Sequence, residues 1–216
     1  MKKRNSYAVF GLGRYGIAVA KELVENGKEV IAIDSDQKIV NDASAFLPVC
    51  KCADVTDAEV ISRLGIGNID TVIICMASNL EATVMAITLC KEAGVDTVIA
   101  KCANEMHQKI LLRVGADEVV FPENESGIRL AKNLVSSGFI DMISLSKDVS
   151  LLEIDVKKEW VGKNLIELNL RKKYGFNIVA LKNGKQVNVN INPEQLLDEE
   201  TTLIVVANTS RLKKFR

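Results

Sequence analysis

The sequence predicts an α/β protein in which a Rossmann-like, doubly wound parallel sheet is followed by a second, smaller α+β domain. Two observations carry this prediction. From Tyr7 to about Phe121, short apolar runs alternate with amphipathic helical runs, which is the pattern of a parallel sheet covered by helices. After Ser146 the pattern changes to alternation of apolar and polar residues, which is typical of half-buried strands.

Six strands are expected in the first domain. Several of them are continuous apolar runs, such as residues 72–74 and 98–100, because the strands of a parallel sheet are covered on both faces. The six expected strands cover residues 7–10, 29–33, 48–52, 71–76, 97–101 and 118–121.

Helical patterns lie between these strands. Residues 15–25 form an amphipathic run that Gly27 ends, and Gly94 ends another helix before a strand; glycine is the common residue just past a helix C-terminus. The helix that begins after Pro122 carries acidic residues in its first turn, where they favour the helix dipole. Its apolar stripe continues beyond the last expected strand of the sheet.

The alternation of strands and helices stops near residues 136–138. A short helix is expected around residues 165–168, Asn183-Gly184 predicts a hairpin between two strands, and a last strand is expected over residues 202–206. We therefore expect a nucleotide-binding domain at residues 1–137, a hinge at 138–146 and a C-terminal domain at 147–216. A unit of about 70 residues is near the lower limit for a stable core, so it is expected to pair with a copy of itself.

The charge balance excludes one class of partner. The chain has 28 basic and 28 acidic residues and a formal net charge of zero, so it lacks the attraction that non-specific nucleic-acid binders use. Apolar runs are strand-sized, well below the roughly 20 residues that cross a bilayer. The N-terminus lacks the apolar stretch of a signal peptide. We therefore expect a cytosolic protein that does not bind nucleic acid.

Five cysteines stand mostly in apolar stretches, as expected of reduced core thiols in a cytosolic protein. Cys50 and Cys52 form a Cys-x-Cys pair, but no second pair follows and the chain has one histidine. A zinc site is therefore disfavoured. A redox sensor that uses this pair stays open as an alternative, provided that the thiols are reactive.

A glycine-rich loop is the main functional signal. Residues 11–16 (GLGRYG) form a G-x-G-x-x-G that directly follows a strand and opens a helix, the context in which this motif binds a dinucleotide. Gly11 allows the tight turn, Gly13 lets the backbone approach a phosphate, and Gly16 lets the helix pack on the strand. The helix N-terminus adds N–H groups and partial positive charge toward that phosphate.

Acidic residues follow the next two strands. Asp34 ends the second strand, 21 residues after Gly13, close to the spacing of about 20 at which an acid binds ribose hydroxyls. A carboxylate there would repel a 2′-phosphate, so NADP is disfavoured relative to NAD, ATP or ADP. Asp54, after the third strand, is expected near the adenine. Alternatively, Asp34 is a surface carboxylate that caps the next helix.

Arg14 stands inside the glycine loop. Its guanidinium could bind phosphate in its own subunit or across a dimer, or it could be a solvated arginine at a helix start. Other polar residues follow later strands at the same carboxyl edge, where ligands of doubly wound folds bind. The full set of expected nucleotide contacts is Gly11, Gly13, Arg14, Tyr15, Gly16, Asp34, Ser35, Asp54, Val55, Ala77, Ser78, Asn79, Lys101 and Glu125. Glu125 is also the candidate ligand for a divalent cation on a polyphosphate, or simply an acid in a first helical turn.

The sequence does not predict an enzyme. It contains no G-x-S-x-G, H-E-x-x-H or Walker lysine motif, and the second domain is small for a substrate domain. A nucleotide-sensing module is favoured. A small NAD(H)-dependent reductase that uses Asp34 for the ribose is the alternative.

Four segments resemble the RCK family of cytosolic regulatory subunits of Ktr/Trk potassium transport systems. They are residues 8–16 (AVFGLGRYG), 53–57 (ADVTD), 112–117 (LRVGAD) and 171–180 (RKKYGFNIVA). The resemblance implies an N-terminal RCK domain and a TrkA-C-like domain, assembled as dimers into an octameric ring that docks on a separate membrane channel.

The same resemblance implies roles for individual residues. ATP and ADP would compete at the glycine loop and change the ring conformation. Arg14 would sense the γ-phosphate from the neighbouring subunit, Asp34 would hold the ribose, and Glu125 would bind a bridging cation. In related regulators the C-terminal domain receives cyclic di-AMP at a dimer interface; the matching residues here are Leu165, Ile166, Arg171, Asn177, Ile178 and Pro193. The apolar members of this set could instead form a simple dimer core.

Overall fold

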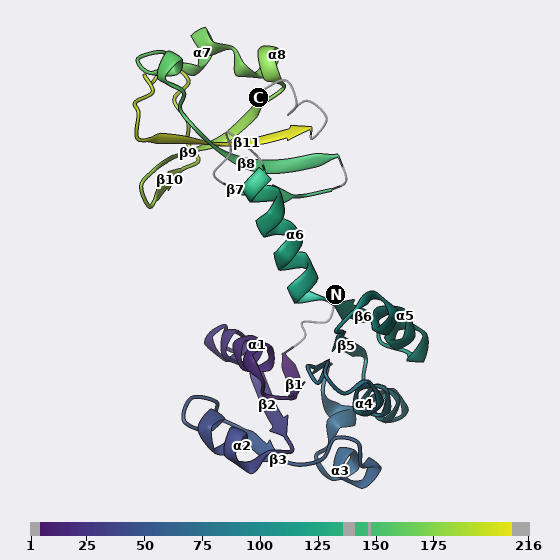
Figure 1. The fold of residues 1–216 in the computed structure, drawn as a ribbon. Coiled ribbons are helices and arrows are strands. Elements are labelled where there is room, and N and C mark those ends of the chain that lie inside the picture. The colour runs from purple at the N-terminus through teal and green to yellow at the C-terminus, as the bar shows by residue number, and fades with distance from the viewer. Residues whose placement is uncertain (1–4, 136–140, 147, 209–216) are drawn as a thin grey trace. The chain divides into compact units, whose positions relative to one another are not determined.

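The computed structural model describes residues 5–135, 141–146 and 148–208. Contacts within the chain divide it into two compact units, residues 1–122 and 123–216 (Figure 1). The predicted break in the alternation at residues 136–138 lies outside the described residues.

The first unit is built on a six-stranded parallel sheet, as predicted. Its spatial order is β3-β2-β1-β4-β5-β6, the order of the doubly wound dinucleotide-binding fold. The strands are β1 (Ser6–Phe10), β2 (Glu29–Asp34), β3 (Cys50–Cys52), β4 (Thr71–Ile74), β5 (Thr97–Lys101) and β6 (Glu118–Val120). Since the order reverses between β1 and β4, a crevice is expected at the carboxyl ends of these two strands.

Two helical layers cover this sheet. The helices are α1 (Arg14–Glu25), α2 (Gln37–Ala43), α3 (Ala58–Arg63), the 3-10 helix η1 (Ile66–Asn68), α4 (Leu80–Glu92) and α5 (Glu105–Val114). On β1, Ala8 and Phe10 pack in one buried cluster with residues of α3, α4 and α5, whereas Val9 packs in a second cluster with α1 and α2. Successive residues of a strand face opposite sides of the sheet, so the continuous apolar strands fill both layers.

Short polar side chains begin the helices that follow β2 to β5. Asp36, Asp57, Asn79 and Asn104 are the N-caps of α2, α3, α4 and α5, and each side chain accepts a hydrogen bond from a backbone N–H of the first turn. This satisfies donors that have no partner inside a helix. The caps therefore fix where each helix leaves the carboxyl edge of the sheet.

Asp117 connects three elements of the first unit. Its Oδ2 atom accepts hydrogen bonds of 2.6 Å from the Lys91 ammonium group of α4 and of 2.6 Å from the Val98 N–H of β5. Partial burial pushes the pKa of Asp117 upward, but these hydrogen bonds outweigh it and hold the pKa below its ordinary value. The carboxylate thus ties the end of α4 to the start of β6.

The second unit contains an antiparallel sheet of five strands in the order β10-β9-β11-β8-β7. Its elements are α6 (Pro122–Val135), β7 (Asp141–Ser144), β8 (Val149–Asp155), the 3-10 helix η2 (Lys158–Trp160), α7 (Leu165–Leu168), α8 (Leu170–Tyr174), β9 (Asn177–Asn183), β10 (Gln186–Asn188) and β11 (Thr201–Asn208). The predicted helix at 165–168 and the hairpin at Asn183-Gly184 are present.

Three elements of this unit were not predicted: β7, the 3-10 helix η2 and α8. β7 lies inside the segment expected to be a hinge; it is a four-residue strand that pairs with β8, and so short a strand has no clear pattern of its own. α8 follows α7 after Asn169, whose φ of 46° is left-handed. This single residue ends one short helix and starts the next, which apolar spacing does not reveal.

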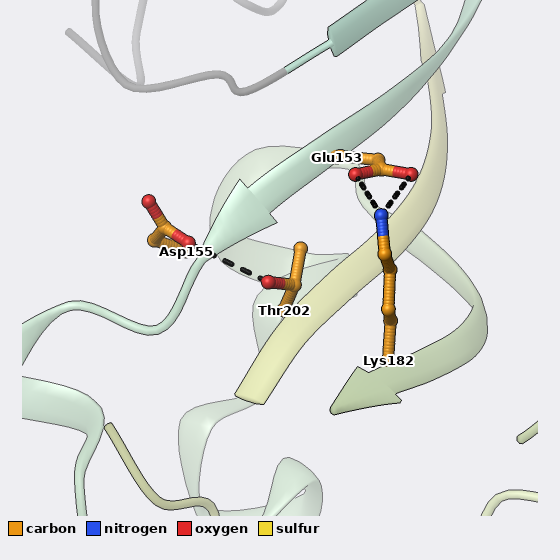
Figure 2. Close-up of polar contacts among 4 residues, drawn as sticks. All are labelled: Glu153, Asp155, Lys182 and Thr202. Carbon is orange, nitrogen blue, oxygen red and sulfur yellow. Dashed lines mark hydrogen bonds and ion pairs between the residues drawn. The ribbon is translucent and has the colours of Figure 1, made fainter. Parts of the chain in front are cut away.

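One face of the second sheet carries the core and the other carries polar contacts. Leu152, Ile154 and Leu203 pack against Trp160 and Phe176 on the core face. On the opposite face, the Lys182 ammonium lies 2.8 and 3.1 Å from the two Glu153 carboxylate oxygens, and the Thr202 hydroxyl lies 3.5 Å from Asp155 Oδ1 (Figure 2). Because Glu153 is on β8 and Lys182 on β9, this ion pair spans the central strand β11.

Acidification is expected to remove the contribution of Asp117 to stability. Its folded pKa is held below the ordinary 3.8, so the stabilisation is complete above that value and is lost as the pH falls through the folded pKa. Urea unfolding of the wild type and Asp117→Asn should show a difference in unfolding free energy that is full at pH 7 and shrinks as the pH falls below about 4. Asp42→Asn is the control, and an equal Asp117 effect at pH 7 and pH 3 would contradict this role.

Candidate nucleotide site

A cavity of about 410 Å³ opens at the carboxyl edge of the first sheet. Of the residues that the sequence predicts to contact a nucleotide, six line it: Gly11, Asp34, Ser35, Asp54, Val55 and Asn79. Ile33, Ala53, Thr56, Met76, Glu81, Ala82 and Met85 line it as well. The cavity therefore lies where the reversal of strand order between β1 and β4 predicts a ligand crevice.

Two glycines of the loop are required by the protein itself. Gly11 has φ +86° and donates its N–H to the Ile33 carbonyl at 2.8 Å. A Cβ at residue 16 would lie 2.0 Å from the Gly11 carbonyl oxygen and 3.4 Å from Cys75 Cβ. Gly16 is therefore required by the close packing of α1 on the loop, and Gly11 by its left-handed backbone conformation.

Gly13, unlike Gly11 and Gly16, is not required by the packing or the backbone conformation of the loop. It is the N-cap of α1 with φ −67°, and a Cβ built on it would meet nothing within 4 Å. Arg14, the first residue of α1, is exposed, and no acidic residue stands in the first turn. The space in front of the helix N-terminus is thus open, and the partial positive charge there is not offset by a nearby acid of the first turn.

Asp34 joins the end of β2 to the glycine loop. Its Oδ2 accepts the Leu12 N–H at 2.7 Å, and its Oδ1 accepts the Asp36 N–H at 2.9 Å. Asp36, rather than Asp34, caps α2, so the capping alternative for Asp34 is wrong. An ionised carboxylate offers about four acceptor positions, so two backbone donors leave Asp34 able to accept ligand hydroxyls.

Asp54 lies on the loop between β3 and α3. Its Oδ1 accepts hydrogen bonds from the Thr56 hydroxyl at 2.7 Å and the Thr56 N–H at 2.9 Å. The hydroxyl bond, followed by the backbone bond, lowers the pKa of Asp54 below its ordinary value. The group is therefore an ionised acceptor at neutral pH.

Helix α4 contributes cavity residues that the sequence analysis missed. Glu81, Ala82 and Met85 come from its first two turns, directly after Asn79, whose side chain accepts the Ala82 N–H at 3.0 Å. The signal was available, because Glu81 and Met85 are four residues apart and thus share a helix face. The sequence does not reveal which face of α4 lies against the cavity, because that depends on how α4 packs on the sheet.

The remaining predicted contacts lie outside the cavity lining. Lys101 Nζ, at the end of β5, lies 5.4 Å from the centroid of the Tyr15 ring on α1, so these two residues form a pair of their own. Ala77 and Ser78 follow β4 without contributing to the lining. Glu125 belongs to the first turn of α6 in the second unit, and the described residues hold no group of three or more His, Cys, Asp or Glu side chains suited to a metal ion.

The cysteines differ in exposure. Cys90 and Cys102 are buried, Cys50 and Cys75 are half-buried, and Cys52 is exposed. Burial raises the pKa of the Cys75 and Cys90 thiols to about 12 each, which keeps them protonated and unreactive at neutral pH. The expectation of core thiols therefore holds for Cys90 and Cys102 and not for the exposed Cys52.

A second cavity, of about 460 Å³, lies in the C-terminal unit. It is lined by Leu165, Ile166, Asn169, Leu170, Arg171, Phe176, Asn177 and Ile178, which include five of the six residues predicted for a second messenger. Pro193 is not in the lining, but its carbonyl oxygen accepts the Leu165 N–H at 3.1 Å. Residues of α7, of α8 and of the start of β9 thus line one cavity, and Arg171 of α8 is part of its wall.

Alanine substitutions at Gly16 and Gly13 should show which loop glycine the fold requires and which it does not. Gly16→Ala forces a Cβ against the Gly11 carbonyl, and overpacking of this kind costs about 1–3 kcal/mol, so the midpoint of thermal unfolding should fall by roughly 5 °C. Gly13→Ala meets no atoms and should change the midpoint by less than about 2 °C. Circular dichroism melts of both variants test this, and equal losses would contradict the assignment of distinct roles.

Comparison with known proteins identifies the domains. The TrkA-N domain model matches residues 7–122 and the TrkA-C domain model matches residues 149–216. The chain is 38% identical over 215 residues to the Ktr system potassium uptake protein C of Bacillus subtilis (strain 168), covering 100% of this chain and 96% of that protein. It is 31% identical over 213 residues to the Ktr system potassium uptake protein A of the same bacterium, covering 99% and 96%.

A solved structure shares the fold over nearly the whole chain. The GsuK channel bound to NAD aligns with a TM-score of 0.65 and 16% identity, covering 98% of this chain and 38% of that one. In the part of the chain that the structure describes, every helix is too short or too polar to cross a membrane. The two matched domains and the identity to both Ktr proteins show that this chain belongs to the RCK family of Ktr potassium uptake regulatory subunits, which are not enzymes.

Proposed function

We propose that this regulatory subunit senses ATP and ADP at the cavity of its first unit and thereby switches a Ktr potassium transporter. The observation that carries the proposal is the open space at Gly13, next to a cavity of about 410 Å³ that contains Asp34. A glycine that the fold does not need, at a helix N-terminus, leaves room for a phosphate. Asp34 keeps acceptor positions for ribose hydroxyls. Membership of a non-enzymatic family excludes the reductase alternative as the function.

NAD(H) remains a second ligand for the same site. The acid at the end of β2 suits the adenosine ribose of NAD as well as that of ATP or ADP, and the GsuK channel, which shares this fold, is described as bound to NAD. All three ligands contain an ADP moiety, so the same contacts would hold them. They differ in the group that is attached to the second phosphate.

Arg14 would distinguish these ligands by reading the third phosphate. It is exposed at the start of α1, where its guanidinium can reach beyond its own loop, and a charge-assisted bond to phosphate is strong and directional. In the assembly that we propose, the chain forms dimers and an octameric ring, and Arg14 of one subunit contacts the γ-phosphate in the next. Glu125 would hold a divalent cation there.

The ring would act on a separate membrane subunit from its cytoplasmic face. As a component of a Ktr system, the chain works with a membrane transporter subunit. An effector can shift an equilibrium only by binding two conformations with different affinity. We propose that ATP favours the ring conformation that opens the pore and that ADP favours the one that closes it.

Arg14→Ala tests the γ-phosphate role. Affinity for ATP, measured by calorimetry on the full chain, should fall at least about tenfold while affinity for ADP changes less than about threefold, because only ATP offers the third phosphate. Lys21→Ala, an exposed cation farther along α1, is the control and should leave both affinities unchanged. Equal losses for ATP and ADP in Arg14→Ala would refute the role of Arg14, and absence of nucleotide binding to the wild type would refute the sensing function.

The second cavity supports a second-messenger function for the C-terminal unit. We propose that two copies of this cavity face one another across a dimer and hold cyclic di-AMP. Ile166 is 59% exposed although it is apolar, and together with Leu165 and Ile178 it offers an apolar surface to a base. Arg171, in the same lining, would bind a phosphate.

Arg171→Ala should weaken cyclic di-AMP binding at least about tenfold, since it removes the one cation of this cavity lining. Lys172→Ala, its exposed neighbour outside the lining, should retain wild-type affinity. Equilibrium dialysis with labelled cyclic di-AMP gives both values. Equal affinity of the two variants would show that Arg171 is not the phosphate ligand, and a wild type that does not bind would end the proposal for this cavity.

A further inference from the structure

We propose that Glu81 is a specificity-determining residue that makes the first cavity select a 6-aminopurine base over a 6-oxopurine base. This inference deepens the proposed nucleotide function and rests on it. It concerns the base, whereas the glycine loop, Asp34 and Arg14 concern the phosphates and the ribose.

The place of the base follows from the order of the other contacts. Phosphates belong at the glycine loop and the N-terminus of α1, and the ribose belongs at Asp34, where β2 ends. The cavity continues past Asp34 to the loop after β3 and to the first two turns of α4. A base attached to that ribose therefore has the residues of these two segments as its surroundings.

The walls of this part of the cavity suit a flat ring. Val55 follows β3, Met76 follows β4 and Met85 comes from the second turn of α4. Methionine side chains adapt to the faces of aromatic rings and make favourable sulfur contacts with them. Ligand sites commonly combine such apolar walls with a few polar groups that fix orientation.

The charged groups at the base end are all acceptors. Asp54 and Glu81 are the acids that join the lining beyond Asp34, and the lining contains no Lys, Arg or His. Asp54 already uses Oδ1 for two hydrogen bonds from Thr56. Within the described part of the chain, the Glu81 carboxylate has neither a hydrogen bond nor an ion pair. Glu81 is thus exposed, and its carboxylate oxygens are available as acceptors to a ligand.

An acceptor of this kind distinguishes the two purine classes. The 6-amino group of adenine donates N–H bonds, and a donor to a carboxylate makes a charge-assisted hydrogen bond. The 6-oxo group of hypoxanthine or guanine instead presents lone pairs, which a carboxylate repels. A site built to bind an NH group rejects analogues that lack it.

The test compares matched pairs of ligands on the full chain by calorimetry. ADP is paired with IDP, and NAD with its hypoxanthine analogue, so the comparison does not depend on which nucleotide is preferred. The wild type should bind the amino member at least about tenfold more tightly. Glu81→Gln keeps the size of the side chain but supplies an amide donor, so it should reduce the ratio at least about threefold, mainly by improving binding of the oxo member.

Glu92→Gln is the matched control, because Glu92 is an exposed acid at the other end of the same helix and lies outside this cavity. It should keep the wild-type ratio, and both variants should keep the wild-type melting temperature. A wild type that binds both members equally, or a Glu81→Gln variant with an unchanged ratio, would overturn the inference while leaving the nucleotide function standing. Failure of every ligand to bind would overturn the nucleotide function itself.

Discussion

The carbonyl oxygen of Gly11 occupies the space that a side chain of residue 16 would need, and this close approach sets the geometry of the ligand edge. A Cβ at residue 16 would lie only 2.0 Å from that oxygen, so α1 can pack this closely on the loop only with glycine at residue 16. The loop is then held between α1 and the end of β4. Gly11 of the loop, the end of β2 and the start of α4 lie around one cavity.

The ribose-binding role that we propose for Asp34 would be combined with a structural role, because the same carboxylate holds the glycine loop. Its carboxylate holds the Leu12 N–H and the Asp36 N–H, so a ligand hydroxyl that binds the same oxygens acts directly on the glycine loop. In the proposed function, occupation of the cavity would therefore be coupled to the conformation of the loop through this one side chain. This is a local route by which a bound nucleotide can favour one arrangement of α1 over another.

The two units achieve stability by different means. The first unit buries both faces of its sheet, with Phe10 on one face and Val9 on the other inaccessible to solvent. The second unit buries one face, and on the other it places the Lys182–Glu153 pair across β11 (Figure 2). The two side chains of this pair are still 31% and 22% exposed, so solvent weakens their attraction, and the aromatic and aliphatic core around Trp160 is the main source of stability of this unit.

The sequence by itself determined the features that depend on local pattern. The six strands of the first sheet, the helix at 165–168 and the hairpin at Asn183-Gly184 were predictable because periodicity, glycine stops and turn residues are local signals. The same holds for Gly11, Asp34 and Asp54, since the carboxyl ends of parallel strands meet at one edge.

Tertiary structure decided what depends on contacts between distant segments. β7 exists because β8 pairs with it, and α8 depends on the left-handed Asn169. The approach of α4 selected Glu81 and Met85 as cavity residues and left Ala77, Ser78 and Lys101 outside the lining. Sequence spacing places residues on a helix face or at a strand end, but packing of one element against another decides which of them share a cavity.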